Sequence, residues 1–443
     1  MSDLVTSRIF VDGEKGITAA KLNDITASSV IQPAFYTGKP TASTADPADV
    51  MLHLKAGAYT QVPVSTLAAS ISTSQIWATR LRSFNAAGNC SFECDQRSVG
   101  ATVAAANGLV VDRWAVVKSG TLVVSGGQQP AAAGDVLVPG TNFAISRSFL
   151  RVTLTTAEAS LGVGDYLMIR QLVEGPPFRE LQYDVHSVSL LVRSSVAGLK
   201  FGLFLQDPAT TSKSLLKLCT IPSANTWTLI SLPNLPIWPA GNFTSAPGAN
   251  GYVFGICLAA GSTYTASAAD TWQNGNFLGA PGQSNFAASP VNSTFDIAFV
   301  QHEPGPVCTT FIDKPFSQNY DECLRYFCKS YDYATALGTN TGLGVISGWN
   351  GVPSVAGTDF RANVMFPKPM AASMGTAPVL SGAGYYTWTV AGVGNGVRDV
   401  GGAADRGVVT LSGSSTRLSN LTLSANLSAN SYGNFHYKAD TGW

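Results

Sequence analysis

Short stretches in which apolar and polar residues alternate recur along the middle of this 443-residue chain, and they restrict it to a fold built mainly from β-strands. In "FLRVTLTT", Leu150, Val152 and Leu154 alternate with Arg or Thr. Because successive side chains of a strand point to opposite faces of its sheet, this period of two predicts a half-buried strand. Further stretches repeat the pattern, and their predicted inward residues are Val188, Leu190 and Val192; Phe201, Leu203 and Leu205; Tyr252, Phe254, Ile256 and Leu258; and Phe295, Ile297 and Phe299.

Loops rich in Gly, Pro, Asn and Ser separate these strands, as two antiparallel sheets packed face to face require. We therefore expect a jelly-roll β-sandwich over residues 79–306. Alternation returns in "FRANVMFPKPM", "YYTWTVAG", "RGVVTLSG" and "LTLSANL", which predicts a second, smaller sandwich over residues 336–443. The predicted fold class is mainly β, with two antiparallel sandwiches.

The region between the two sandwiches, residues 307–335, contains a clear helical pattern, "DECLRYFCKSY" at 321–331. Ser317 is a suitable N-cap residue for it. The residues expected on one face of this helix are Tyr320, Cys323, Leu324, Phe327 and Tyr331. The sequence thus predicts an amphipathic helix that joins the sandwiches.

The start of the chain has a different character. Residues 1–30 hold a short helical pattern, and Phe10, Leu22 and Ile25 are its candidate anchor residues. A helix of two turns is unstable alone, so we expect this segment to dock on another surface. Residues 31–78 read as an extended linker followed by a small hairpin, in which "VMLHL" and "YTQVPV" flank the turn-like "KAGA".

The charge content limits the possible partners. Charged residues are 12% of the chain, against a usual share of about 25%, which predicts that other subunits or partners cover part of its surface. Lys plus Arg equals Asp plus Glu, 27 against 27, without a basic cluster, which argues against a nucleic-acid partner. We expect neither a signal peptide nor membrane insertion, because the sequence shows no basic start followed by an apolar run and no apolar stretch of spanning length.

The sequence gives no support for a metal site or a cofactor. The seven cysteines lack paired CxxC spacing and are expected to be small buried hydrophobes; they are Cys90, Cys94, Cys219, Cys257, Cys308, Cys323 and Cys328. The four histidines are scattered, so zinc ligation is not predicted. No catalytic residues are predicted either, since acidic residues are sparse and no two suggest a shared cleft.

The best ligand candidates are polar and aromatic residues in loops. The loop "AGSTYTASAADTWQNGNFLGAPGQSNFAASPVNS" is longer than a compact domain usually tolerates without a function. A Trp or Tyr ring beside amide or carboxylate groups suits a sugar, which presents apolar C–H faces beside hydroxyls. The candidate glycan-binding residues are Tyr264, Asp270, Trp272, Gln273, Asn274, Trp349 and Asn350. Each Trp could equally be a packing residue or an intersubunit residue.

Two motifs with arginines, "DQR" (95–97) and "DRW" (112–114), allow a sugar-holding function or a structural cluster. We favour the structural interpretation, in which arginines pair with carboxylates and Trp114 fills the core. The same interpretation applies to Gln171, Glu174 and Arg179.

Seven blocks occur in the order found in a jelly-roll domain of bacteriophage fibre proteins, a domain similar to carbohydrate-binding modules. They are "NCSFECDQRSVG", "VVDRWAVV", "YLMIRQLVEG", "SVSLLVRSS", "PSANTWTLISL", "FDIAFVQHEPG" and "DECLRYFCKS". The opening "FVDGEKGITAAKLNDI" resembles the start of phage appendage proteins, and "VMFPKPMAASMGTAPVL" and "FHYKADTGW" resemble the second domain and ending of fibres. Ala371 and His302 depart from the family pattern, which often has Arg and Leu there.

The resemblance implies a structural fibre of a virion, attached to the tail or head, which binds host cell-surface polysaccharide for adsorption. It also implies a homotrimer whose N-terminus docks on a tail adaptor, a nozzle or the capsid. Two alternatives remain open. One is a purely structural head fibre or decoration protein without receptor binding, and the other is a glycan depolymerase. The second is less favoured, because the sequence lacks the turn-by-turn repeat of a β-helix.

Overall fold

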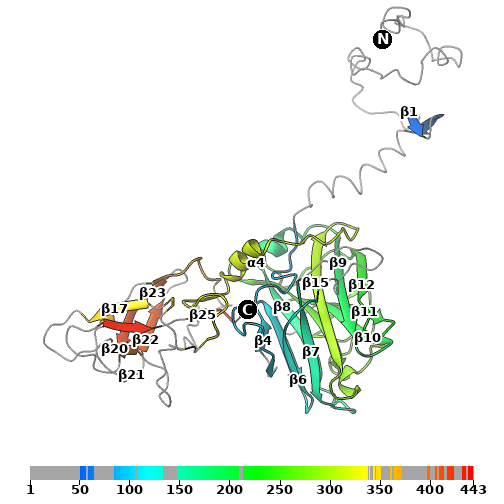
Figure 1. The fold of residues 1–443 in the computed structure, drawn as a ribbon. Coiled ribbons are helices and arrows are strands. Elements are labelled where there is room, and N and C mark those ends of the chain that lie inside the picture. The colour runs from blue at the N-terminus through cyan, green and yellow to red at the C-terminus, as the bar shows by residue number, and fades with distance from the viewer. Residues whose placement is uncertain are drawn as a thin grey trace, which may run out of the picture. The chain divides into compact units, whose positions relative to one another are not determined.

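The computed structural model in Figure 1 divides into two compact units, Met1–Arg80 and Leu81–Trp443. It describes residues 50–55, 58–63, 84–104, 108–132, 147–208, 213–337, 339, 343–344, 346–350, 360–361, 364–371, 397–399, 405–406, 409–413, 417–423, 432–435 and 438–442. In the first unit, β1 (Val50–Lys55) pairs with β2 (Ala58–Pro63) in antiparallel register, so the predicted hairpin is confirmed. The predicted anchor residues Phe10, Leu22 and Ile25 lie outside the described residues.

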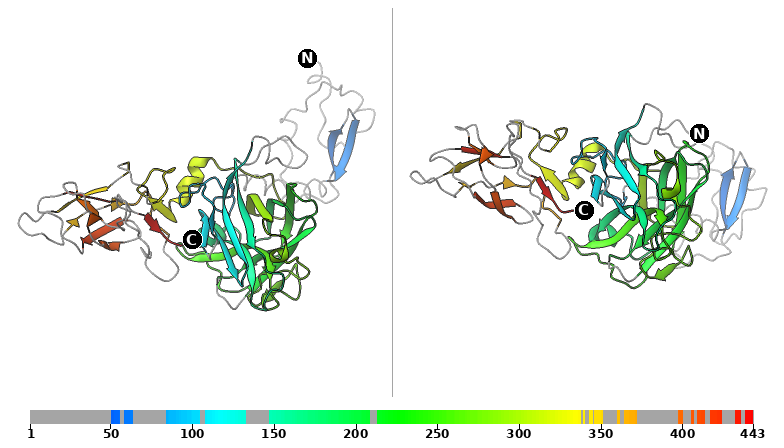
Figure 2. Two further views of the ribbon diagram at one scale, coloured as in Figure 1. Left: turned by 60° about the horizontal axis from the view of Figure 1, so that its bottom comes forward. Right: turned by 90° about the horizontal axis from the view of Figure 1, so that it is seen from below.

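The second unit contains a sandwich of two antiparallel sheets, which face each other in Figures 1 and 2. The seven-stranded sheet has the order β14-β11-β10-β13-β8-β5-β4, and the six-stranded sheet has the order β12-β9-β15-β7-β6-β3. The strands of the first are β4 (Gly108–Val111), β5 (Trp114–Ser119), β8 (Tyr166–Glu174), β10 (Leu199–Gln206), β11 (Lys213–Ile221), β13 (Asn250–Ala260) and β14 (Trp272–Asn274). Those of the second are β3 (Val103–Ala104), β6 (Val123–Pro130), β7 (Ser148–Thr156), β9 (His186–Ser194), β12 (Thr228–Leu235) and β15 (Thr294–Pro304).

The core between these sheets is built from the alternating residues. Leu150, Val152 and Leu154 of β7 are fully buried in it, as the sequence predicts. Trp114 is fully buried in it, with its ring centroid 5.2 Å from that of Phe92. The mainly β fold is therefore confirmed for the described residues of this sandwich.

Phe299 was predicted to face the core, but it lies on the opposite face of its sheet. Phe295 and Ile297 of β15 point into the core, but the pairing of β15 with β9 shifts between Ile297 and Phe299. An extra residue in a strand reverses the alternation beyond it. Phe299 therefore lies on the outer face of the six-stranded sheet, with Phe149 and Leu191.

The predicted helix is shorter than expected and begins earlier. Helix α4 covers Phe316–Cys323, its N-cap is Pro315, and Ser317 lies inside it instead of capping it. The chain then turns into β16 (Phe327–Lys329), whose residues are all buried. Phe327 and Tyr331 therefore do not belong to a helical stripe, because tertiary pairing overrides the local helical preference here. The other helical segments described are α3 (Gly175–Arg179) and a 3-10 turn, η2 (Phe286–Ala288).

The end of the chain returns to the sandwich region. Strand β25 (Lys438–Asp440) pairs with β16. Asp440 is 2.5 Å from Arg97, and Arg97 is also 2.9 Å from Asp112. This pair of carboxylates around one arginine fixes the closing residues of the chain against the start of the sandwich.

Between β16 and β25 the chain forms two further antiparallel sheets, with the strand orders β18-β17-β24-β20-β21 and β19-β23-β22. Their strands are β17 (Ile346–Asn350), β18 (Phe360–Arg361), β19 (Val364–Met365), β20 (Val397–Asp399), β21 (Asp405–Arg406), β22 (Val409–Gly413), β23 (Arg417–Leu423) and β24 (Tyr432–Phe435). In the part of the chain that the structure describes, no helix is long and apolar enough to cross a membrane.

Candidate functional site

The outer face of the seven-stranded sheet is the surface that combines aromatic rings, apolar side chains and a positive charge. On β8, Leu167 and Ile169 point into the core, so the residues between and beyond them point outward. Tyr166, Met168 and Leu172 of that outward row form a second apolar cluster on the outer face. Arg170 lies in the same row and is half-buried.

The long loop after β13 covers one half of this face. Its residues Leu278 and Ala280 pack on Phe204 of β10, which is fully buried. A side chain at Gly202 would meet Gln283 and the backbone of the loop, so the loop rests directly on the strand there. Glycine within a strand often marks such a close approach.

The other half of the face, over β5 and β8, is partly open. Ala115, Val117, Arg170 and Leu172 are all half-buried there. The register places Val117 beside Met168 and Ala115 beside Arg170. The result is a shallow apolar floor with one guanidinium in it.

Two tyrosine rings form one edge of this floor. Tyr264 comes from the long loop and Tyr166 from β8, and their centroids are 5.1 Å apart at an interplanar angle of 78°. Both rings are half-buried, so each keeps exposed surface. Burial and the neighbouring Tyr264 raise the pKa of Tyr166, while Arg170 lowers it, so its hydroxyl remains a donor at neutral pH.

Of the predicted glycan-binding residues, Tyr264 lies at the edge of this floor. Trp272 packs at the edge of the core, 5.2 Å from Trp238 between ring centroids, and its Nε1 donates to the Pro236 carbonyl at 3.3 Å. Its ring therefore serves packing, the alternative that the sequence left open.

The polar candidates of the same loop are bonded within the fold. Gln273 accepts from the Ser267 hydroxyl at 2.9 Å and donates to the Ala268 carbonyl. Asn274 accepts from Lys213 at 2.5 Å, and the exposed carboxylate of Asp270 pairs with Lys217 at 2.5 Å.

Trp349 and Asn350 lie on β17, where Trp349 pairs with Arg361 and Tyr432 and Asn350 pairs with Phe360. The described strand pairings do not bring these two residues to the outer face of the sandwich. The sequence reasoning missed Tyr166 and Arg170. An arginine in the outward register of "YLMIRQLVEG" was the available signal, since a strand rarely places a lone charge among apolar neighbours.

The arginine motifs are structural, but only Arg97 pairs with a carboxylate as the favoured interpretation expects; among the described contacts Arg113 has a ring and a carbonyl instead. Arg97 bonds to Asp112, and Trp114 is buried in the core. Arg113 stacks on the Tyr326 ring, 3.5 Å from its centroid, and donates to the Leu172 carbonyl at 2.7 Å. These contacts join the strands to the segment after α4.

Glu174 is the shared hydrogen-bond acceptor of a second structural cluster. It accepts from Arg325 at 2.5 Å and from the Tyr326 hydroxyl at 2.7 Å. Burial raises the pKa of Glu174, but these hydrogen bonds outweigh it and hold the pKa below its usual value. Gln171 bonds to the backbone of Gly88, whereas Arg179 is exposed beside Glu180.

A hollow of about 460 Å³ lies between the first described residues of the sandwich and α4. Its carboxylates are already paired, Glu322 with Lys314, Asp321 with Lys368, and Glu174 with Arg325. These ion pairs hold neighbouring segments of the chain together around the hollow.

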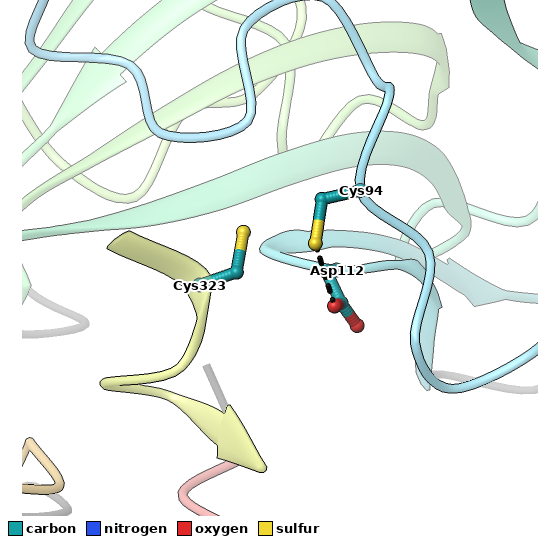
Figure 3. A group of neighbouring side chains, drawn as sticks. All are labelled: Cys94, Asp112 and Cys323. Carbon is teal, nitrogen blue, oxygen red and sulfur yellow. Dashed lines mark hydrogen bonds between the residues drawn. The ribbon is translucent and has the colours of Figure 1, made fainter. Parts of the chain in front are cut away.

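Cys94, Asp112 and Cys323 meet in the interior, with ligand-type atoms within 4.8 Å of one another (Figure 3). The Cys94 thiol donates to Asp112 at 3.3 Å, and the same carboxylate accepts from Gln96 and Arg97, both at 2.9 Å. Burial raises the pKa of the Cys94 thiol well above its ordinary value, so the thiolate that a metal needs is disfavoured. The donors of this group are used within the fold, and they do not fit a metal site. All seven thiols are free, and six of them are buried, as expected for small hydrophobes.

No protein-family model matches the sequence, and no curated protein matches it. Among solved structures, the chain is similar to TmCBM61 in complex with β-1,4-galactotriose (11% identity, 50% of this chain and 99% of that chain, TM-score 0.27). It is also similar to a family 11 carbohydrate-binding module of Clostridium thermocellum (10% identity, 47% and 98%, TM-score 0.24). A third similarity is to the enzymatically active domain of tailspike protein 4 of bacteriophage CBA120 (11% identity, 49% and 21%, TM-score 0.24). TM-scores this low do not decide function. The assignment of a β-sandwich rests on the strand pairing described above.

Proposed function

We propose that the sandwich binds a cell-surface polysaccharide with the outer face of its seven-stranded sheet. The observation that carries this proposal is the half-open floor over β5 and β8, edged by the paired rings of Tyr166 and Tyr264. A sugar ring can lay its C–H face on Val117 and the tyrosine rings, which keep exposed surface, while the tyrosine hydroxyls bond its hydroxyls.

The proposal extends to the whole chain as a structural fibre of a bacteriophage virion. The seven sequence blocks in fibre order and the low content of charged residues support it. In this account the N-terminus docks on the tail or head of the particle, and the strands between β17 and β24 form a second sandwich. The chain would be a homotrimer, whose linked sites raise the effective concentration for rebinding and offset weak single contacts.

Binding without cleavage fits the chemistry of this face. Its described residues offer rings, aliphatic side chains and one guanidinium, and none of them is a pair of carboxylates such as glycoside hydrolases use. We therefore propose a receptor-binding fibre, and not a depolymerase. The purely structural fibre is the rival that the following experiment separates.

The test is retention of the full chain on an array of bacterial capsular and lipopolysaccharide glycans. The matched variants are Tyr166→Ala, Tyr264→Ala and Tyr183→Ala, the last a control because Tyr183 is 86% exposed and lies outside the face. We expect wild type and the control to bind, and the first two variants to bind at least about tenfold more weakly. A fibre without receptor binding would retain no glycan, and chain shortening on the array would indicate a depolymerase.

A further inference from the structure

Arg170 differs from the other half-buried arginines of the described sandwich. Arg97, Arg151, Arg193 and Arg325 each bond to a carboxylate. The described residues provide no hydrogen-bond or ion-pair partner for the guanidinium of Arg170. Among the described residues, its positive charge therefore has no carboxylate that compensates it.

The neighbours of Arg170 keep its flanks free of long side chains. Ala115 is its partner on β5, and Gly255 is its partner on β13. The space that a side chain at Gly255 would fill is taken by the ring of Phe204. The side chain of Arg170 thus leaves its strand between a methyl group on β5 and, on β13, a glycine covered by the buried ring of Phe204.

These surroundings strengthen any contact that the charge makes. An ion pair in a partly desolvated apolar setting is screened less by water and salt than one at an exposed site. Burial lowers the pKa of Arg170, and the nearby Tyr166 raises it. Arginine still stays protonated at any physiological pH.

We propose that Arg170 binds the carboxylate of an acidic sugar, so that the glycan recognised by this face contains uronic acid residues. This inference rests on the proposed function of the face. A carboxylate carries one negative charge and two coplanar oxygens, which match the single charge and the planar fork of one guanidinium. Tyr166 and Tyr264 then hold the ring of the same or the next sugar.

A simpler explanation is that the stem of Arg170 covers apolar surface while its head stays in water. In that case its charge has no ligand, and Arg170→Met would bind glycan as wild type does. Arg170→Lys keeps the charge but loses the planar fork, so it separates charge attraction from bidentate recognition.

The experiment uses the full chain on bacterial polysaccharides that contain uronic acids, each presented in its native form and after reduction of its carboxyl groups to alcohols. Neutral polysaccharides are included. The variants are Arg170→Gln, Arg170→Met and Arg170→Lys. Arg179→Gln is the control, since it removes an exposed arginine outside the face. Thermal unfolding of each variant verifies that it folds.

We expect wild type and the control to bind the native acidic polysaccharides and to lose at least tenfold in affinity when the carboxyl groups are reduced. Arg170→Gln and Arg170→Met should lose about the same factor, and Arg170→Lys should retain an intermediate affinity. Binding of wild type should weaken as salt rises from 50 to 500 mM, because part of it is ionic.

Equal binding to native and reduced polysaccharide, or unchanged binding by Arg170→Gln, would overturn the inference. Retention of neutral polysaccharides alone would also overturn it, yet leave the proposed glycan-binding function intact. If the folded chain retains no polysaccharide of any kind, both the inference and the proposed function fail.

Discussion

The outer faces of the two sheets carry arginines in opposite situations. On the six-stranded sheet, Arg151 and Arg193 flank Asp296 across three strands, at 2.8 and 2.9 Å. Both guanidiniums also lie over the ring of Phe149, 5.2 Å from its centroid. On the seven-stranded sheet, Arg170 has apolar strand neighbours, and no carboxylate of the described residues pairs with it. A compensated cluster belongs to the fold, whereas an uncompensated charge on a half-open face is available to a ligand.

The largest effect is expected from breaking the compensated cluster. Asp296→Asn would leave two arginines without their carboxylate, one of them only 14% exposed. The loss in free energy of unfolding should be about 3 kcal/mol, as for other partly buried pairs that lose one member. Urea unfolding measures it. A loss below about 0.5 kcal/mol would show that this cluster does not stabilise the fold. The contrast between the two outer faces would then not hold.

The second prediction sharpens the contrast between the covered and open halves of the seven-stranded sheet. In Gly255→Ala, the new methyl group would overlap the ring of Phe204, which is fully buried beneath the long loop. Overpacking of this kind costs about 1–3 kcal/mol. The control is Gly164→Ala, where a side chain would meet nothing within 4 Å. Equal stability of the two variants would mean that the ring of Phe204 is not packed against Gly255 of β13.

The third prediction concerns the interior of the sandwich, where buried histidines should make the free energy of unfolding depend on pH. His302 bonds to Tyr252 at 2.7 Å and to His186 at 2.9 Å, and burial lowers the pKa of both histidines, that of His186 to about 3. Below about pH 6.5 the unfolded chain binds protons that the folded chain does not, so stability falls by up to about 1.4 kcal/mol per pH unit for each histidine. Arginines do not titrate in this range.

Unfolding measured at pH 7.5, 6.5 and 5.5 tests this slope, and His302→Leu should reduce it. Asp95 acts in the opposite direction, because burial raises its pKa to about 6 and its protonation below that pH favours the folded state. A stability that stays level or rises from pH 6.5 to 5.5 would contradict the account of the histidine pair.

The smallest effect on stability is expected at Arg170 itself. Arg170→Gln removes no ion pair among the described residues, so the free energy of unfolding should change by no more than about 0.5 kcal/mol. If Arg170→Gln and Asp296→Asn lose the same free energy of unfolding under the same conditions, the contrast between the two faces is refuted. That result would mean that Arg170 is part of a structural cluster too.

The sequence predicted the sandwich well because its signal is local. Leu150, Val152 and Leu154 carry the period of two that a half-buried strand imposes, and each is buried as expected. Phe299 was misplaced because a bulge depends on the partner strand, which the alternation does not reveal. The residues after Cys323 were misassigned for a similar reason, since β16 is held by β25, more than a hundred residues further along.

The candidate site was less predictable. Tyr264 was selected from the composition of its loop, and it lies on the open face. Trp272, selected in the same way, packs against Trp238 instead. Which of two aromatic residues faces solvent depends on the path of the loop over the sheet. Tyr166 and Arg170 were missed because "YLMIRQLVEG" entered the sequence analysis only through the fibre resemblance and through its polar residues Gln171 and Glu174.

Side-chain footprinting of the full chain with hydroxyl radicals, with and without a bound bacterial oligosaccharide, tests the central claim most directly. Our account predicts that the ligand protects Tyr166, Tyr264 and Leu172. Tyr183 and Leu229, which are 86% and 41% exposed, should be labelled equally in both samples. Protection of Leu229 on the six-stranded sheet, with unchanged labelling of the two tyrosines, would contradict the account.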